Sequence, residues 1–368
     1  MKKSACHYIG IMSGTSMDAI DATLLSFEND KPHLIETYST PISKELKNKI
    51  ISLCENKSDI KTLGEMDTQL GNLFATTALN LLKKSNYNAS DIIAIGSHGQ
   101  TIYHQPFGEF PFTLQIADPN TIAAKTNITT VADFRRKDVA LGGQGAPLVP
   151  AFHEYLFGRK TYDQWVLNLG GIANLTFIPA DQSKSMVGFD VGPANTLLDQ
   201  WCEKHCGKSF DANGDWARSG TLNSGLLSVF CDDPYFKKSF PKSTGREYFN
   251  WQWLTEKLNA FPKTVSPVDI QNTLTELTAR TIADAITSPS TLWLCGGGTY
   301  NRYLIARLQA NLPQVEVIST TEMGIAPQWI EASAFAWLAK QTIEKKTSNC
   351  PGVTGASRDA ILGGIYTA

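Results

Sequence analysis

The first part of the chain alternates between apolar runs and a polar turn. Hydrophobic residues fill most of residues 5–12, glycine, serine and threonine occupy residues 13–16, and alternating apolar positions resume from Ile20 to Phe27. Period-two alternation on both sides of a short turn is typical of a β-hairpin. We therefore expect two strands within residues 5–27, joined by an unusually polar turn.

Apolar residues then recur at helical spacing. The pattern predicts helices over residues 43–54 and 60–84, followed by a strand over residues 92–97. That strand runs directly into His98-Gly99-Gln100-Thr101, where three side chains can donate or accept hydrogen bonds. Polar side chains at a strand end indicate a binding site.

The opening pattern recurs later in the chain. Residues 165–178 again alternate as strand, turn and strand, with the turn at Gly170-Gly171. A third apolar strand, residues 291–295, ends in Gly296-Gly297-Gly298 and precedes a helical pattern over residues 300–312. The chain thus has three glycine turns, each at the end of an apolar strand.

Further helices are predicted over residues 193–206, 267–287 and 327–344, each with a proline at or near its first turn. A mixture of hairpins and helices favours two α/β domains over a barrel or a helical bundle. We expect the break between the domains near residues 133–145, where charged residues and glycines concentrate.

The composition is that of an ordinary globular protein. The 368 residues are enough for two domains, and 33 Lys+Arg against 35 Asp+Glu leave a net charge of −2. We therefore expect no nucleic-acid partner, and the lack of any apolar stretch near the roughly 18 residues of a membrane span leads us to expect no membrane partner. The seven scattered cysteines favour a reducing cytoplasm.

Several familiar motifs are absent or incomplete. The sequence Gly207-Lys208-Ser209 has Cys202 where a P-loop needs its first glycine, and the triple glycine fails the dinucleotide pattern at Asn301. Cys202, His205 and Cys206 would share a helical turn, but no second Cys/His pair accompanies them, so packing is favoured over a zinc site.

The three glycine turns are the strongest chemical signal. Glycine lets backbone N–H groups approach phosphate oxygens without a Cβ in the way. Two hairpin turns followed by a strand-to-helix glycine loop resemble the actin/hexokinase/Hsp70 ATPase superfamily. Within it, five motifs resemble the anhydro-N-acetylmuramic acid kinase family over nearly the full length; they lie at residues 11–18, 97–101, 142–150, 168–174 and 188–195.

The resemblance implies a two-domain actin/hexokinase-like (ribonuclease H-like) α/β fold with a nucleotide cleft between its lobes. It places an N-terminal lobe at residues 1–135, to which residues from about 350 to 368 return, and a C-terminal lobe at residues 136–349. It also implies a homodimer that uses ATP and Mg²⁺ to convert the sugar 1,6-anhydro-N-acetylmuramic acid into N-acetylmuramic acid 6-phosphate, a step of cell-wall recycling.

The implied chemistry needs only one base. Water that attacks C1 expels the sugar's own O6, and this alkoxide can attack the γ-phosphorus, so the leaving group needs no separate acid. The resemblance assigns the base to Asp190. If Pro193 occupies the first position of its helix, Asp190 lies too far upstream for the usual N-cap.

The resemblance assigns the remaining candidates by motif. ATP would bind at the three glycine turns, where Ser13 can also donate to phosphates; the residues are Gly14, Thr15, Ser16, Met17, Asp18, Ala19, Ile20, Asp21, Gly170, Gly171, Gly296, Gly297 and Gly298. Asp18 would hold Mg²⁺ through water. The sugar would bind at His98, Gln100, Thr101, Asp133, Arg135, Gln144 and Glu331, with Arg135 or Arg136 meeting the lactyl carboxylate.

Three positions depart from the family pattern: Ala19 and Ala194 replace an expected glycine, and Val191 replaces an expected threonine. Two other functions remain open. A conventional sugar kinase would use Asp190 to deprotonate a free hydroxyl. An actin-like or chaperone-like ATPase module would instead use the nucleotide to switch a partner surface.

Overall fold

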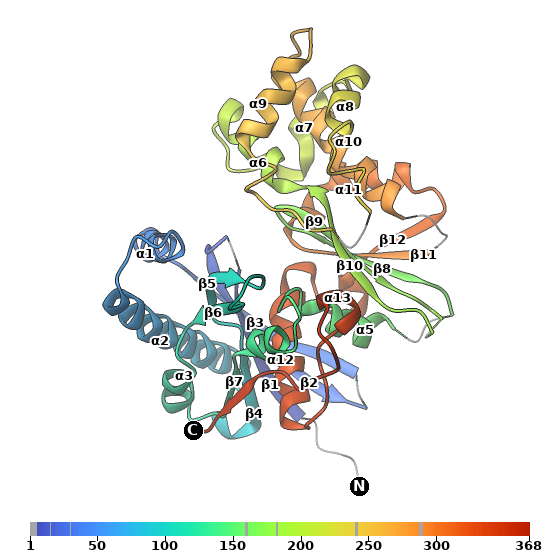
Figure 1. The fold of residues 1–368 in the computed structure, drawn as a ribbon. Helices are drawn as coiled ribbons and strands as arrows, with labels where there is room; N and C mark the ends of the chain where they lie inside the picture. Colours follow the sequence, from blue (N-terminus) through green and yellow to red (C-terminus); the bar gives the residue numbers. More distant parts are fainter. Residues whose placement is uncertain are drawn as a thin grey trace. The chain divides into compact units, whose positions relative to one another are not determined.

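The computed structural model describes residues 6–14, 16–29, 31–158, 161–181, 183–239, 242–286 and 290–368. The chain divides into two units. Unit 1 comprises Met1–Leu156 and Trp329–Ala368, and unit 2 comprises Phe157–Gln328 (Figure 1).

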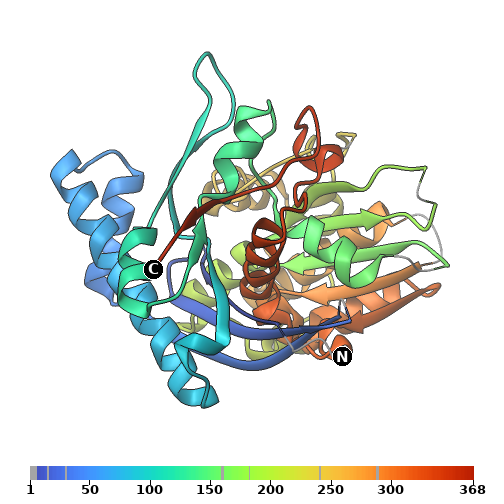
Figure 2. The ribbon, with the colours of Figure 1, turned by 90° about the horizontal axis from the view of Figure 1, so that it is seen from below.

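Unit 1 is built on a six-stranded sheet. Its strands are β1 (Cys6–Ser13), β2 (Ala19–Glu28), β3 (Lys31–Pro41), β4 (Ile92–Ser97), β7 (Thr130–Ala132) and β13 (Gly364–Tyr366), in the order β13-β7-β4-β1-β2-β3. The first three are antiparallel neighbours, and β4 and β7 run parallel to β1. The C-terminal strand pairs with β7, so the red end of the chain lies beside this sheet in Figure 2.

Helices cover both faces of this sheet. They are α1 (Lys44–Cys54), α2 (Ile60–Ser85), α3 (Pro119–Thr126), α4 (Phe134–Ala140), α12 (Ile330–Ile343) and α13 (Pro351–Thr354), with α5 (Val149–Phe157) at the end of the unit and the short η1 (Ala89–Asp91) before β4. Ser43 and Asp59 cap α1 and α2, because each side chain accepts a backbone N–H of the first turn. A separate hairpin, β5 (Gln100–Gln105) and β6 (Phe112–Ile116), follows β4.

Helix α12 approaches the sheet at two glycines. A methyl group on Gly10 of β1 would lie 1.9 Å from the carbonyl oxygen of Ala332, and one on Gly96 of β4 would lie 1.9 Å from that of Phe335. Real Cβ atoms do not come so close, so only glycine allows the helix backbone to rest on these strands. The contact brings the start of α12, which carries Glu331, next to the sheet.

Unit 2 repeats the strand order of unit 1. Its strands are β8 (Gln164–Leu169), β9 (Ile172–Ile178), β10 (Val187–Pro193), β11 (Ser290–Cys295) and β12 (Val315–Ser319), in the order β10-β9-β8-β11-β12. Three antiparallel strands are again followed by two that run parallel to the first. This duplicated order, third-second-first-fourth-fifth, confirms the ribonuclease H-like fold class.

A helical layer completes unit 2 and has its own apolar core around Trp201, Phe230 and Phe249. Its helices are α6 (Asn195–Cys206), α7 (Asp215–Ser219), α8 (Ser224–Cys231), α9 (Trp251–Ala260), α10 (Pro267–Ala285) and α11 (Arg302–Asn311). Short turns of 3₁₀ helix lie at η2 (Ala212–Gly214), η3 (Gly297–Tyr300), η4 (Thr320–Met323) and η5 (Pro327–Trp329). Ser266 caps α10, whose first residue is proline as expected.

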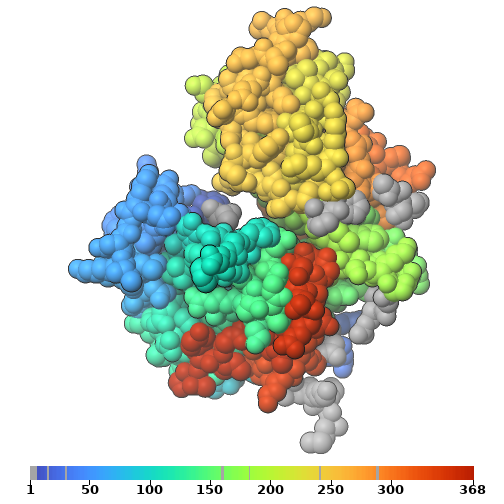
Figure 3. Space-filling view, viewed as in Figure 1, coloured from blue at the N-terminus to red at the C-terminus, as the bar shows by residue number. Residues whose placement is uncertain are grey.

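Two expectations about the organisation were wrong. Residues 136–156 and 329–349 belong to unit 1 rather than to the second lobe, because α12 packs on β1 and β4 and the 138–145 loop bonds to the C-terminal segment. In Figure 3 that segment (red) lies against this green region, where Gln144 N–H donates to the Thr354 carbonyl over 2.7 Å. Pro193 ends β10 instead of starting α6, which begins at Asn195.

Helix α2 has a glycine with the opposite surroundings to Gly96. No atom lies within 4 Å of the position a methyl would take on Gly64, which is exposed. We expect Gly96→Ala to lower the free energy of unfolding by about 3 kcal/mol, because the methyl forces α12 off the sheet. Gly64→Ala, the matched control, should raise it by about 1 kcal/mol through helix propensity. Urea denaturation measures both; equal effects of the two substitutions would contradict the packing described.

Candidate active site

The carboxylate of Asp190 is held by three donors. The Asn174 Nδ2 amide donates to Oδ1 over 2.9 Å, while the Ser243 hydroxyl and the Thr244 backbone N–H donate to Oδ2 over 2.8 and 3.0 Å. Asn174 lies directly across from Asp190 in the β9–β10 pairing. A carboxylate has about four acceptor positions, so this arrangement fixes its direction and leaves one free for a substrate.

The backbone of Asp190 is tied down as well. Its N–H donates to the Lys242 carbonyl over 3.0 Å, and the Tyr235 hydroxyl donates to its carbonyl over 2.7 Å. Asp190 therefore lies within a strand rather than at a helix N-cap, and the cap of α6 is Ala194. The sequence analysis missed the segment 242–246; its run of lysine, serine, threonine, glycine and arginine was the available signal.

Two of the three glycine turns meet in unit 2. The carbonyl of Gly171 accepts the N–H groups of Ala194 and Thr196, and that of Gly170 accepts the N–H of Asn195. A methyl on Gly298 would lie 2.8 Å from Cβ of Leu169 and 3.0 Å from the Asn195 amide. The Gly170-Gly171 turn, the start of α6 and the Gly296–Gly298 loop therefore form one surface.

The glycine loop has a fixed shape and a fixed neighbour. Gly296 has φ +84°, and a methyl there would lie 2.3 Å from Oδ1 of Asn168, so a side chain is excluded on both counts. Gly297, in contrast, has no atom within 4 Å of its Cβ position and is open to a ligand.

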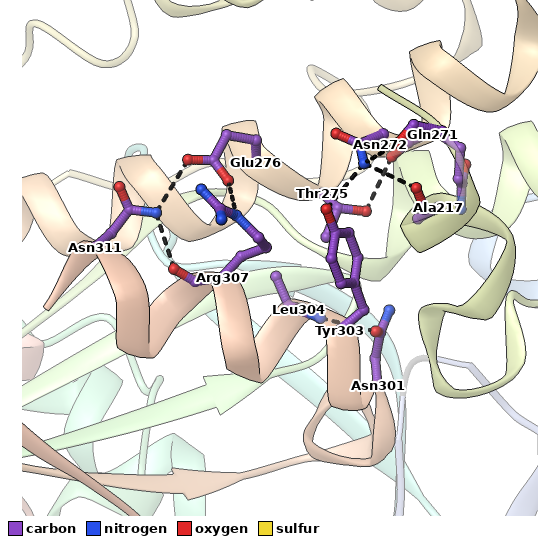
Figure 4. Close-up of polar contacts among 11 residues, drawn as sticks. Ala217, Gln271, Asn272, Thr275, Glu276, Asn301, Tyr303, Leu304, Arg307 and Asn311 are labelled. Carbon is purple, nitrogen blue, oxygen red and sulfur yellow. Dashed lines mark hydrogen bonds and ion pairs between the residues drawn. The ribbon is translucent and has the colours of Figure 1, made fainter. Parts of the chain in front are cut away.

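Helix α11, which follows this loop, is anchored to α10 by polar contacts (Figure 4). Arg307 Nε donates to Glu276 over 2.6 Å, and the Asn311 amide donates to the same carboxylate over 3.0 Å. Asn272 donates to the Tyr303 hydroxyl over 2.9 Å and to the Ala217 carbonyl over 2.8 Å. These bonds hold α11 along its length, and the Tyr303 contact holds its start next to the loop.

The first glycine turn lies in unit 1, between β1 and β2. Met17 N–H donates to the Gly14 carbonyl over 3.1 Å, and Met17 has φ +54°. Ser16 is exposed beside it, while Ala19 and Ile20 begin β2; Thr15 lies outside the described residues. Asp18 is exposed and pairs with Lys47 over 2.7 Å.

Polar side chains on both sides of this turn bond to neighbouring strands. Burial raises the pKa of Asp21, which accepts a hydrogen bond from Ser39 over 2.7 Å. The Ser13 hydroxyl donates to the Gln100 Oε1 over 2.7 Å, which links the end of β1 to the start of β5. The hairpin end is thus fixed by side chains from four strands and is not a loose polar turn.

His98, Arg135 and Glu331 are brought together in unit 1. Nη2 and Nε of Arg135 lie 2.9 and 3.2 Å from Nε2 of His98, and Nη1 donates to the Gly145 carbonyl over 2.7 Å. Burial, and secondarily the Arg135 charge, lower the pKa of His98 to about 3, so its imidazole is neutral. Burial lowers the pKa of Arg135 to about 10. Burial also raises the pKa of Glu331; the Arg135 charge works against this rise, and the Asp21 charge adds to it.

The other sugar candidates, Thr101, Asp133 and Gln144, also lie in unit 1. Thr101 accepts a hydrogen bond from Gln115 over 3.2 Å, and Gln144 bonds through its backbone to the C-terminal segment. Asp133, whose pKa burial raises, pairs loosely with Arg136 over 3.5 Å. His98, Asp133 and Arg136 line a cavity of about 410 Å³. Arg136 is more exposed than Arg135. Arg135 already donates to the Gly145 carbonyl and so is less available to a ligand.

The residues present fit magnesium better than zinc. Asp18 and Asp21 offer carboxylate oxygens at the start of β2, and Mg²⁺ favours one or two carboxylates together with water and phosphate oxygens. Among the described residues there is no group of three His, Cys, Asp or Glu side chains arranged for a metal ion. Cys202 is buried, and the His205 ring packs at a tilt against Trp201 with ring centroids 4.0 Å apart.

The three departures from the family pattern do not disturb these contacts. Val191 and Ala194 are buried in the apolar core of unit 2, and Ala19 pairs with Pro41 at the edge of the β2–β3 ladder. None of the described helices is both long and apolar enough to cross a membrane.

Comparison with known proteins identifies relatives over nearly the whole chain. A sequence profile described as "Anhydro-N-acetylmuramic acid kinase" matches residues 6–368. The chain belongs to the anhydro-N-acetylmuramic acid kinase family. It is 53% identical to a family member from Coxiella burnetii (strain Dugway 5J108-111). The alignment spans 364 residues, which are 98% of this chain and 97% of the relative. The chain is 48% identical over 366 residues to the family member from Shewanella halifaxensis (strain HAW-EB4), with 98% and 99% covered.

The likeness to solved structures is looser than to these kinases. The crystal structure of component A of Acidaminococcus fermentans (R)-2-hydroxyglutaryl-CoA dehydratase aligns with a TM-score of 0.48 at 10% identity, over 90% of this chain and 96% of that one. The family membership, and not this likeness, makes the chain a kinase.

The buried imidazole of His98 predicts how stability depends on pH. Its pKa is about 3 when folded and about 6.5 when unfolded, so the unfolded chain binds more protons between these values and stability falls as the pH drops below about 6.5. We expect His98→Gln, which keeps an acceptor for Arg135, to reduce the loss of unfolding free energy between pH 7 and 5 by about 2 kcal/mol. Urea denaturation at both pH values measures this, and an unchanged pH dependence would contradict a neutral His98.

Proposed function

We propose that this kinase opens the 1,6-anhydro bond of 1,6-anhydro-N-acetylmuramic acid with water and phosphorylates O6. The products are N-acetylmuramic acid 6-phosphate and ADP, as in cell-wall recycling. The observation that carries the proposal is the carboxylate of Asp190, which three donors orient and which keeps an acceptor position free. Membership of the family supplies the substrate class.

In the first step Asp190 acts as the base. A water molecule on the free acceptor position of the carboxylate attacks C1 of the sugar and gives its proton to Asp190. The new bond joins the water oxygen to C1, the bond between C1 and O6 breaks, and its electron pair goes to O6. Asn174 and Thr244 hold the carboxylate in one direction during this transfer.

In the second step O6 attacks the γ-phosphorus of ATP. The bond between O6 and phosphorus forms, and the bond to the bridging oxygen breaks with its electron pair leaving on ADP. Asp190 then returns its proton to solvent. No other acid is needed, because the leaving group of the first step is the nucleophile of the second.

The glycine turns support the nucleotide role. We assign the phosphates to Gly14–Asp21 and to Gly170-Gly171, and the adenosine to the Gly296–Gly298 loop. Gly297 is open at its Cβ position, and the anchoring of α11 on α10 keeps the loop rigid. A rigid loop can bind a ligand without first having to be ordered.

The polar cluster of unit 1 supports the sugar role. We assign the sugar hydroxyls and the acetamido group to His98, Gln100 and Glu331, with Arg135 as the residue that fixes His98. The neutral His98 can take part in hydrogen bonds without adding charge. Thr101, Asp133 and Gln144 remain proposed contacts of the same sugar, and the exposed Arg136 suits its lactyl carboxylate better than Arg135 does.

We assign Mg²⁺ to Asp18, through water, with Asp21 as its neighbour. When bound, the ion neutralises phosphate charge and so makes the γ-phosphorus easier to attack. Lys47 contacts Asp18 over 2.7 Å and keeps this exposed carboxylate directed. A homodimer and a cytoplasmic location complete the proposal.

Mass spectrometry of a reaction with 1,6-anhydro-N-acetylmuramic acid and Mg-ATP tests the function. We expect a sugar phosphate that has gained one water and one phosphoryl group, and a fall of about 10³-fold in kcat for Asp190→Asn. The matched control is Asp232→Asn, which changes an exposed carboxylate of the same unit that pairs with Lys237, and should leave kcat unchanged.

Other outcomes would select a different function. Phosphorylation of an ordinary free sugar but not of the anhydro sugar would point to a conventional sugar kinase. ATP hydrolysis with no acceptor at all would point to a nucleotide-dependent switch. Full activity of Asp190→Asn on the anhydro sugar would remove Asp190 as the base.

A further inference from the structure

Two side chains lie directly against the second glycine turn. A methyl group on Gly171 would lie 2.5 Å from Oγ1 of Thr196 and 3.1 Å from both Nε and Nη2 of Arg246. Thr196 is in the first turn of α6, and Arg246 comes from the segment that also bonds Asp190. The turn is therefore flanked by a hydroxyl and a guanidinium group that the sequence analysis did not single out.

The hydroxyl of Thr196 has no partner. The residue is only 5% exposed, and its Oγ1 makes no hydrogen bond within the described part of the chain. Oγ1 of Thr244, one residue past the Ser243 that bonds Asp190, is buried and unpartnered in the same way. Buried hydroxyls are normally hydrogen-bonded, so two orphaned ones beside a carboxylate and a glycine turn indicate that a ligand completes the site.

Arg246 is also free to meet a ligand. It is exposed, and no carboxylate of the described residues lies within ion-pair distance of it. The Arg246 charge does act on Asp199. Burial raises the pKa of Asp199 to about 6, and the Arg246 charge lowers it only in part. A guanidinium group without an ion pair, set against a glycine turn, suits a phosphate group, which it can bind with two parallel hydrogen bonds.

The backbone of α6 cannot take this role. In many nucleotide sites the first N–H groups of a helix bind phosphate. Here the N–H groups of Ala194, Asn195 and Thr196 already donate to the carbonyls of Gly170 and Gly171. The donors left for a phosphate at this turn are the N–H groups of the turn itself and the neighbouring side chains of Thr196 and Arg246.

The same short segment connects the two chemical groups. Ser243 and Thr244 bond the carboxylate of Asp190, and two residues later Arg246 reaches Gly171. The base and the guanidinium group are thus positioned by one stretch of backbone. A group that spans the distance from Asp190 to Gly171 would contact both.

We propose that Arg246, with the hydroxyl of Thr196, binds the oxygens of the phosphoryl group as it passes from ATP to the acceptor. The proposal rests on the kinase activity proposed above. While the bond between the acceptor oxygen and phosphorus forms and the bond to ADP breaks, negative charge is shared among the phosphoryl and bridging oxygens. The guanidinium group stays protonated, takes no part in the proton transfers and stabilises this charge.

Steady-state kinetics with 1,6-anhydro-N-acetylmuramic acid and Mg-ATP test the role of Arg246. We expect Arg246→Gln to lower kcat by at least about 10³-fold while KM for the sugar changes less than about threefold, since the contact forms with the moving phosphoryl group. Thr196→Val, which removes the hydroxyl and keeps the shape, should lower kcat about tenfold. Arg218→Gln is the matched control, because Arg218 pairs with Asp215 on the surface of the same unit, and it should behave as wild type.

A second measurement separates this role from a structural one. Guanidinium ion added to Arg246→Ala should restore part of kcat, and calorimetry should show that Arg246→Gln loses the preference for ATP over ADP. An Arg246→Gln enzyme with kcat within threefold of wild type, or an Arg246→Ala enzyme that guanidinium ion does not rescue, would overturn the proposal.

The two proposals fail differently. A wild-type enzyme that phosphorylates another acceptor, but not the anhydro sugar, would refute the proposed substrate. The kcat of Arg246→Gln relative to that of the wild type, measured with that other acceptor, would then still decide the role of Arg246.

Discussion

The proposed chemistry depends on how one carboxylate is held. Asp190 lies in β10, the edge strand of the unit 2 sheet, where β9 brings Asn174 opposite it and Ser243 and Thr244 bond its other oxygen. Together these bonds fix the orientation of the Asp190 carboxylate. A water bound at the one remaining acceptor position would therefore have a defined direction. The hydrogen bond from Asp190 N–H to the Lys242 carbonyl keeps the segment 242–246 on the strand. This bond ties the segment that carries Arg246 to the strand that carries Asp190.

The repeated strand order explains why the glycine turns fall where they do. In each unit the first strand is central, its antiparallel partner leaves it through a tight turn, and parallel strands lie on its other side. The turn after β8 therefore lies next to the end of β11, where the Gly296–Gly298 loop begins. In unit 1 the turn after β1 lies next to the end of β4, where His98 follows. One topology, used twice, thus places turns at equivalent positions in the two units.

The local sequence was a good guide to elements and a poor one to long-range contacts. Alternation and helical spacing predicted both hairpins, α1, α2 and β4 correctly, because each is decided by neighbours along the chain. Helix α12 was predicted but assigned to the wrong unit, since its place depends on Gly10 and Gly96, more than 200 residues earlier. Pro193 was taken for a helix start, yet β10 continues to it and Thr278 of α10 bonds its carbonyl. The family resemblance named Asp190, His98 and Glu331, whereas Arg246 and Thr196 emerged only once α6 and the 242–246 segment were seen against Gly171.

The most direct test of the account is a single turnover of 1,6-anhydro-N-acetylmuramic acid with Mg-ATP in ¹⁸O-labelled water. If Asp190 activates water against C1 and the expelled O6 takes the phosphoryl group, the product carries one ¹⁸O at C1 and none in the phosphate or in ADP. Label in inorganic phosphate, or a 6-phosphate with no label at C1, would contradict the coupling of bond opening to phosphoryl transfer.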